Sequence, residues 1–183
     1  RIIDDAVETN PNDQYEGDLW GLYLAIEQFD GRALRSRSLP DGNVYNMHFA
    51  QSNLLNEGIG QATDKSDLNE FVSRSGYNMT PTQPVEWWRD NVNLDWYYSY
   101  RAVWEAVNHS DQRDQENSHY YHNPRTGQWS IHPWDVDLLY EEFDRWGPNA
   151  VQSKTPFEQF RKCLNHPELM VEFQNRVREL QDL

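Results

Sequence analysis

Hydrophobic and polar positions change their spacing along this chain, and the change separates two kinds of predicted element. Near the N-terminus, apolar and aromatic residues are dense from about Trp20 to Gln28 and again from Asn43 to Phe49, as is typical of strands. Turn residues at 30–31 and 40–42 bound an arginine-rich connection between them. Two strands joined in this way predict a small antiparallel sheet.

The next part of the pattern is mainly helical. Residues 51–63 are polar and contain glycine, so we expect a loop, after which Asp64 or Ser66 can cap a helix that ends near Gly76. Asn93 can cap a longer helix whose apolar and aromatic residues recur at spacings of three and four. The face so predicted comprises Leu94, Tyr97, Tyr98, Arg101, Ala102, Trp104 and Val107.

The remaining chain predicts a loop, one hairpin and two helices. Residues 108–117 are polar and without periodicity, whereas residues 118–137 suit a β-hairpin with its turn at 124–127. A capping box at 155–158 and a proline that follows His166 predict helix starts near the C-terminus. A β-rich start followed by a mainly helical part with an embedded hairpin predicts an α+β fold, and the length suits a single domain.

Composition narrows the functional classes. The 183 residues include 30 Asp and Glu against 16 Lys and Arg, which gives a formal net charge of −14. Such an excess opposes binding to nucleic acid or to an anionic membrane surface, because both require cationic patches. No apolar run approaches the roughly 20 residues that span a bilayer, and no signal-peptide pattern is visible. The single cysteine, Cys163, excludes an intramolecular disulfide.

Much of the negative charge is local. The segment from Glu86 to Asp144 contains twelve Asp and Glu residues and only four arginines. A solvated acidic surface is one interpretation. The other is a magnesium site, because Asp135 and Asp137 end an apolar strand that we expect to be buried, and Asn117 precedes the hairpin.

Four of the six histidines form a second cluster between His109 and His132. A zinc- or manganese-dependent hydrolase that uses His and Asp ligands is therefore a further hypothesis. His119 and His122 would point to opposite faces of one strand, which is poor for shared ligation. Polar hairpin side chains are the simpler interpretation.

Several blocks of the sequence, in order, resemble the CotH kinase family, which is named for a bacterial spore coat protein. The resemblance implies an atypical protein-kinase-like fold that binds ATP and a divalent cation and phosphorylates Ser or Thr of secreted or coat proteins. The hairpin that ends in the motif PWDVD is the most specific block. The blocks are Gly17–Gln28, Asp41–Tyr45, Asn108–Asp111, Asn117 with the Tyr120-Tyr121 pair, and Pro124–Asp137.

Position by position, the resemblance implies Asp111 as the catalytic acid of the loop, with Asp114 as a rival. It implies Asn117 and Asp135 as metal ligands and Asp137 as a possible second carboxylate ligand. Trp129 and Trp134 are interpreted as core residues rather than as a nucleotide platform.

On the nucleotide side, the resemblance implies that Glu27 organises the site, although an edge-strand glutamate facing water fits equally well. Asn46 stands where the family typically has a lysine, and Arg35 or Arg37 could supply the missing cation. The basic segment that precedes this region in family members is not part of the sequence. We therefore expect one CotH-like domain, 1–183, truncated at its N-terminus, with a β-rich nucleotide-side part, 1–50, and a mainly helical catalytic part, 51–183.

Three functions follow from this reading. The first is an ATP- and Mg²⁺- or Mn²⁺-dependent protein Ser/Thr kinase that is secreted, at the cell surface or in a spore coat. The second is a weak or inactive pseudokinase that serves as an extracellular binding module for a protein or glycan. The third is the His/Asp metal-dependent hydrolase.

Overall fold

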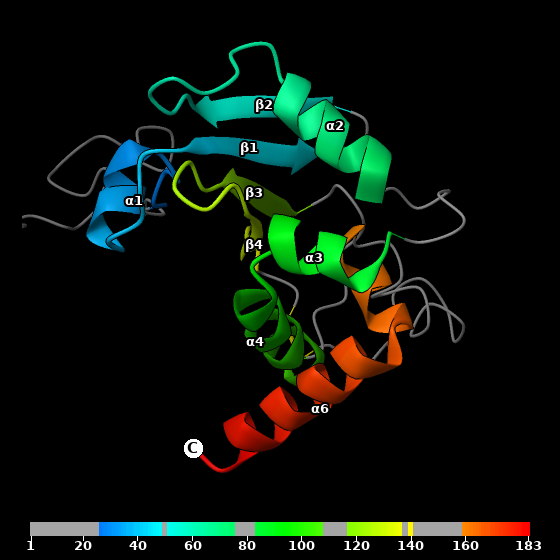
Figure 1. The fold of residues 1–183 in the computed structure, drawn as a ribbon. Helices are drawn as coiled ribbons and strands as arrows, with labels where there is room; N and C mark the ends of the chain where they lie inside the picture. The colour runs from blue at the N-terminus through cyan, green and yellow to red at the C-terminus, as the bar shows by residue number, and fades with distance from the viewer. Residues whose placement is uncertain (1–25, 49–50, 76–82, 108–116, 137–138, 141–158) are drawn as a thin grey trace, which may run out of the picture.

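The computed structural model describes residues 26–48, 51–75, 83–107, 117–136, 139–140 and 159–183 (Figure 1). Among these residues, a short helix and two strands are followed by three helices, a two-stranded hairpin and two C-terminal helices. In chain order the elements are α1 (Gly31–Ser36), β1 (Asn43–His48), β2 (Gln51–Asn56), α2 (Ser66–Ser75), α3 (Val85–Asn91), α4 (Leu94–Ala106), β3 (Ser118–His122), β4 (Trp129–Pro133), the 3-10 helix η1 (Gln159–Asn165) and α6 (Pro167–Gln181).

The four strands form one antiparallel sheet in the order β2-β1-β3-β4. The predicted hairpin β3-β4 therefore pairs with β1 and completes the same sheet as the N-terminal strands. The start of α4 covers the outer edge of β4, where the Asn93 amide donates to the Trp129 carbonyl at 2.9 Å and Trp96 Nε1 donates to the Ile131 carbonyl at 2.6 Å. The α+β prediction is confirmed.

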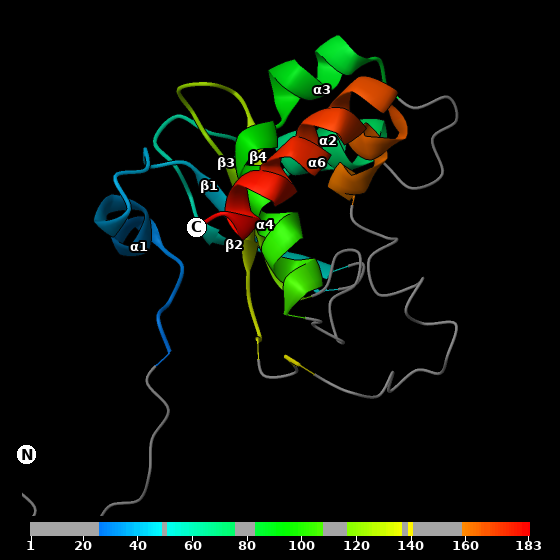
Figure 2. The same cartoon turned by 90° about the horizontal axis from the view of Figure 1, so that it is seen from below.

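Side chains alternate along each strand, so the sheet has two faces. The helix-covered face packs on α2, α3, α4 and η1, and the opposite face, here called the Phe29 face, packs on α1 and Phe29. Figures 1 and 2 show α1 apart from the group formed by α3, α4 and α6. The helix-covered face presents Tyr45, Met47, Tyr120, Trp129 and Ile131, and the Phe29 face presents Val44, His119, Tyr121 and His132.

The strongest helix predictions are confirmed, and their caps explain where the helices begin. The Asn93 side chain accepts a hydrogen bond from the Trp96 amide at 3.1 Å, which starts α4. Asp64 accepts from the Ser66 amide at 3.0 Å before α2, and Pro167 occupies the first position of α6. The buried residues of α4 are Leu94, Tyr97, Tyr98, Tyr100, Arg101 and Trp104.

Two local predictions are wrong. Residues 51–63 were expected to be a loop, yet the main chain of β2 pairs with β1, which places Leu54 and Leu55 against the core although the segment lacks β-branched and aromatic residues. Residues 26–28 belong to no strand, and Asp30 does not form a plain turn. Its carboxylate accepts from the amides of Arg32 and Ala33 and caps α1. Residues 20–25 and the capping box at 155–158 lie outside the described residues.

In the part of the chain that the structure describes, no helix is both long enough and apolar enough to span a membrane.

Candidate functional site

Two predicted metal ligands lie together at the end of the β3-β4 hairpin that is opposite its turn. Ser118 is the register partner of Pro133, and the Trp134 amide donates to the Asn117 carbonyl at 3.3 Å. Asn117 and Asp135, which flank these residues, consequently lie at the same end of the sheet.

Both flanking residues adopt a left-handed backbone conformation. The φ angle is 53° at Asn117 and 55° at Asp135. Non-glycine residues adopt this conformation at some energetic cost, although Asn and Asp tolerate it best, and such residues cluster at functional sites. The backbone thus turns sharply on both sides of the hairpin end, and the hairpin pairing fixes both turns.

The side chains at this end suit a hard cation. Asn117 is buried, whereas Asp135 is exposed, which corrects the expectation that its strand end is buried. An amide oxygen and a carboxylate are ligands that Mg²⁺ accepts together with water and phosphate oxygens. Asp111, Asp114 and Asp137 lie outside the described residues. Within the described residues, no group of three or more His, Cys, Asp or Glu side chains could hold a metal ion.

Asn46 lies on β1 and faces the same side as Val44. Its register partners are Asn53 on β2 and His119 on β3, and His119 in turn pairs with His132 on β4. A row of neutral polar side chains therefore crosses the sheet one pair away from the end that carries Asn117. Asn46 itself brings no charge to this row.

Glu27 is an exposed residue outside any strand, which corrects its predicted place on a buried strand. Its carboxylate forms a two-point ion pair with Arg37, with Nη1 at 3.0 Å from Oε1 and Nη2 at 2.5 Å from Oε2. The hydrogen bond from Arg37 lowers the pKa of Glu27, and Glu27 raises the pKa of Arg37. Of the two arginines that the sequence offered as a substitute cation, Arg37 is the one that contacts Glu27.

Phe29 links this ion pair to the sheet, and sequence reasoning gave it no role. Its ring stacks on His119 with centroids 5.4 Å apart and an interplanar angle of 7°, and it meets His132 at 4.8 Å. The Arg37 guanidinium lies 5.5 Å from the Phe29 centroid. Trp134 packs on His119 at 4.8 Å and connects the same rings to Asp135, the next residue.

The histidines on this face are neutral in the folded protein. Burial lowers the pKa of His119 to about 4. Burial lowers the pKa of His132 to about 3, with smaller effects from His119 and from the charge of Arg37. The Ser130 hydroxyl lies 3.0 Å from His132 Nε2.

His122 lies on the opposite face from His119, as predicted, and stacks on Trp129 at 4.3 Å. Its Nδ1 lies 3.0 Å from Asp67 on α2, a contact across 55 positions that no local pattern indicates. Burial opposes ionisation of Asp67, but hydrogen bonds from groups that include His122 and Tyr45 outweigh it and lower the pKa of Asp67. The position of His122 on the other face disfavours a metal site that it would share with His119 and His132.

Trp129 is buried in the helix-covered core, as predicted, and Trp134 is half-buried. The Trp129 ring stacks on both Phe71 and His122, which leaves it unsuited to serve as a nucleotide platform.

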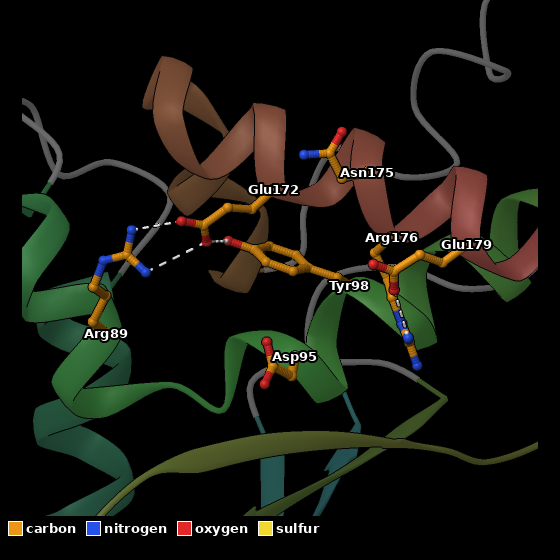
Figure 3. Close-up of a pocket in the computed structure, with 7 residues that line it drawn as sticks. All are labelled: Arg89, Asp95, Tyr98, Glu172, Asn175, Arg176 and Glu179. Carbon is orange, nitrogen blue, oxygen red and sulfur yellow. Dashed lines mark hydrogen bonds and ion pairs between the residues drawn. The ribbon is translucent and has the colours of Figure 1, made fainter.

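A cavity lies away from these residues, between the helices α3, α4 and α6 (Figure 3). Its volume is about 580 Å³, and its lining is mostly charged. Glu172 pairs with Arg89 at 2.6 Å and accepts from the Tyr98 hydroxyl at 3.1 Å, while Arg176 pairs with Glu179 at 2.9 Å. None of the sequence-predicted site residues lines it.

An amide and a carboxylate at the paired end of a hairpin, with an ion-paired arginine over the adjoining sheet face, fit a kinase-like phosphotransferase. The comparison with protein families agrees. The model of the CotH kinase protein matches residues 7–182, nearly the whole chain. The chain belongs to the CotH kinase family, as its motifs indicated, and this membership implies a kinase-like fold and function. A search of curated proteins finds no match.

Proposed function

We propose that the chain is an ATP- and Mg²⁺- or Mn²⁺-dependent protein Ser/Thr kinase of the CotH type that acts on secreted, surface or coat proteins. The observation that carries the proposal is the convergence of Asn117 and Asp135 at one end of the hairpin, each on a left-handed backbone. In this proposal the chain is one domain, with residues 1–50 on the nucleotide side and 51–183 forming the catalytic part.

The reaction needs three contributions from the chain. The oxygen of the acceptor hydroxyl attacks the γ-phosphorus of ATP, the bond to the ADP oxygen breaks, and the hydroxyl proton passes to a carboxylate. Asp111 is the proposed acceptor of that proton and Asp114 the alternative. Asn117 and Asp135 would hold the cation, with Asp137 as a further ligand. A bound divalent cation would offset the negative charge of the phosphate oxygens.

The charge of the chain supports a role for a cation. With a net charge of −14, the protein repels a nucleoside triphosphate at low ionic strength. A divalent ion held by Asp135 would offset this repulsion locally.

Incubation of the full chain with labelled ATP, Mg²⁺ or Mn²⁺ and a set of Ser/Thr proteins tests the proposal. Labelling of the chain or of an added protein is expected from the parent and not from Asp135→Ala. Asp95→Ala, which removes an exposed carboxylate from the cavity of Figure 3, is the matched control and should label normally. Equal labelling by the parent and Asp135→Ala would contradict the proposal.

The cavity between α4 and α6 favours a second candidate, a pseudokinase that serves as a binding module. Its size suits a ligand, and its lining residues offer charges of both signs that a ligand could contact. Thermal denaturation with and without ATP and Mg²⁺ separates the candidates. A nucleotide at 100 times its Kd should add about 2.7 kcal/mol to the free energy of unfolding, whereas a module that ignores ATP shows no shift.

A further inference from the structure

The proposed site needs a protein cation near the nucleotide phosphates. The hairpin end supplies an amide and a carboxylate, and Asn46 on the adjacent strand is uncharged. A metal ion held by Asp135 is partly neutralised by that carboxylate, so a triphosphate retains excess negative charge. Because Asn46 lies on the Phe29 face, we consider the cations that other described elements bring to this face.

Arg37 reaches this face from the end of α1. Its guanidinium lies over the Phe29 ring, which stacks on His119 and contacts His132 at a tilt. His119 is the register partner of Asn46 and lies two residues after Asn117. The charge of Arg37 also contributes to lowering the pKa of His132, so its field extends to the sheet.

The hydrogen bonds of Arg37 leave one edge of the guanidinium available. The two Nη atoms donate hydrogen bonds to the Glu27 carboxylate, and Nη1 also donates to the Ala33 carbonyl at 3.0 Å. Nε and the second hydrogen of Nη2 form the other edge, and neither donates to any group in the part of the chain that the structure describes. The side chain is 42% exposed, so a ligand can approach this edge. Two parallel N–H groups match two oxygens of a phosphate.

Neighbouring arginines lack this arrangement. The Arg32 side chain is 86% exposed and approaches Asp30 at 3.8 Å, and Arg35 is exposed on α1. Neither arginine packs on Phe29. They carry the same charge as Arg37 on the same helix, which makes them matched controls.

We propose that Arg37 binds the nucleotide phosphates through its Nε–Nη2 edge and supplies the cation that Asn46 does not, with Glu27 as the positioning residue that holds the opposite edge. This inference rests on the proposed kinase function. It also predicts that a metal held by Asp135 and the guanidinium of Arg37 would contact different phosphate oxygens.

The test measures binding by isothermal titration of the full chain with ATP plus Mg²⁺ and, separately, with uncharged adenosine. Arg37→Ala should weaken ATP binding about tenfold or more and change adenosine binding less than about twofold, because only a phosphate contact is lost. Arg37→Lys should restore part of the ATP affinity, since it keeps the charge but not the paired donors. Arg32→Ala and Arg35→Ala should bind ATP within about twofold of the parent.

Glu27→Gln tests the positioning role. It should weaken ATP binding several-fold in the parent and have no further effect in the Arg37→Ala background, because Glu27 acts only through Arg37. Circular dichroism of each variant checks that the fold is retained. If the parent binds no ATP, both the proposed function and this inference fail. If the parent binds ATP and Arg37→Ala behaves like Arg32→Ala, this inference alone is overturned.

Discussion

The two faces of the sheet use the same four strands for different purposes. The helix-covered face is a close-packed stack of rings, in which Phe71 lies 4.9 Å from Trp129 and 5.3 Å from Phe160. On the Phe29 face, Phe29 packs on two buried imidazoles, those of His119 and His132, and Trp134 and Trp96 also contact these rings. Burial of polar rings stabilises a fold less than burial of hydrocarbon does. The difference indicates that the first face contributes more to stability, whereas the second is the face on which we propose that the nucleotide phosphates bind.

The largest expected effect concerns stability. Phe71→Ala should lower the free energy of unfolding by about 3–5 kcal/mol, because it leaves a cavity among packed rings. Phe29→Ala should cost about half as much, since water can reach the imidazoles that it uncovers. Urea denaturation followed by circular dichroism measures both values. Equal losses would show that the two faces contribute equally to the core.

The next effect separates function from stability at the hairpin end. Asp135→Gly removes a carboxylate but suits the left-handed backbone at that position. Phosphotransfer should fall by about a hundredfold or more, while the free energy of unfolding changes by no more than about 1 kcal/mol. Labelled-ATP assays and urea denaturation on the same preparation check this. Unchanged phosphotransfer would remove Asp135 from the site.

Acid sensitivity should come from the Phe29 face. The pKa values of His119 and His132 are lowered to about 4 and about 3, whereas an unfolded histidine titrates near 6.5. Below pH 6.5 the unfolded chain binds protons that the folded chain does not, so stability is lost as pH falls from about 6.5 towards 4. The two histidines together should cost up to about 2.7 kcal/mol per pH unit in this window.

His119→Phe keeps a stacked ring but cannot titrate, so it should roughly halve that slope. Urea midpoints measured between pH 6.5 and 5 provide the readout, above the range in which most carboxylates titrate. An unchanged slope would mean that acid acts on another part of the molecule.

The smallest effect is expected at the cavity of Figure 3. Arg89 and Glu172 form an ion pair, yet both side chains are substantially exposed. A double-mutant cycle with Arg89→Ala and Glu172→Ala should give a coupling of less than about 1 kcal/mol. A larger coupling would show that this cavity, like the helix-covered face, is needed for the fold.

Sequence patterns identified the elements that have strong local signals. Asn93 and Asp64 predicted the starts of α4 and α2, because a side-chain cap and helical spacing depend on residues a few positions apart. The hairpin and its flanking Asn117 and Asp135 were likewise visible as a motif. Strand β2 was missed, because its polar sequence becomes a strand only through pairing with β1.

The candidate site was predicted in part for the same reason. Asn117 and Asp135 converge through one hairpin, so their proximity follows from a local turn. Glu27 was named without a partner, Arg35 and Arg37 were named only as alternatives for the missing cation, and Phe29 gave no signal. Their contacts depend on how residues 26–37 lie against the sheet, and sequence spacing does not specify that packing.

The sequence by itself therefore determined the α+β class, the family, the hairpin and the carboxylate that ends it, because each depends on interactions between residues close along the chain. Tertiary structure alone decided that the hairpin completes the N-terminal sheet, that one face of this sheet is covered by helices and the other by Phe29, and that Arg37 is the arginine held by Glu27. These outcomes depend on long-range packing, where many weak contacts between distant segments select one arrangement.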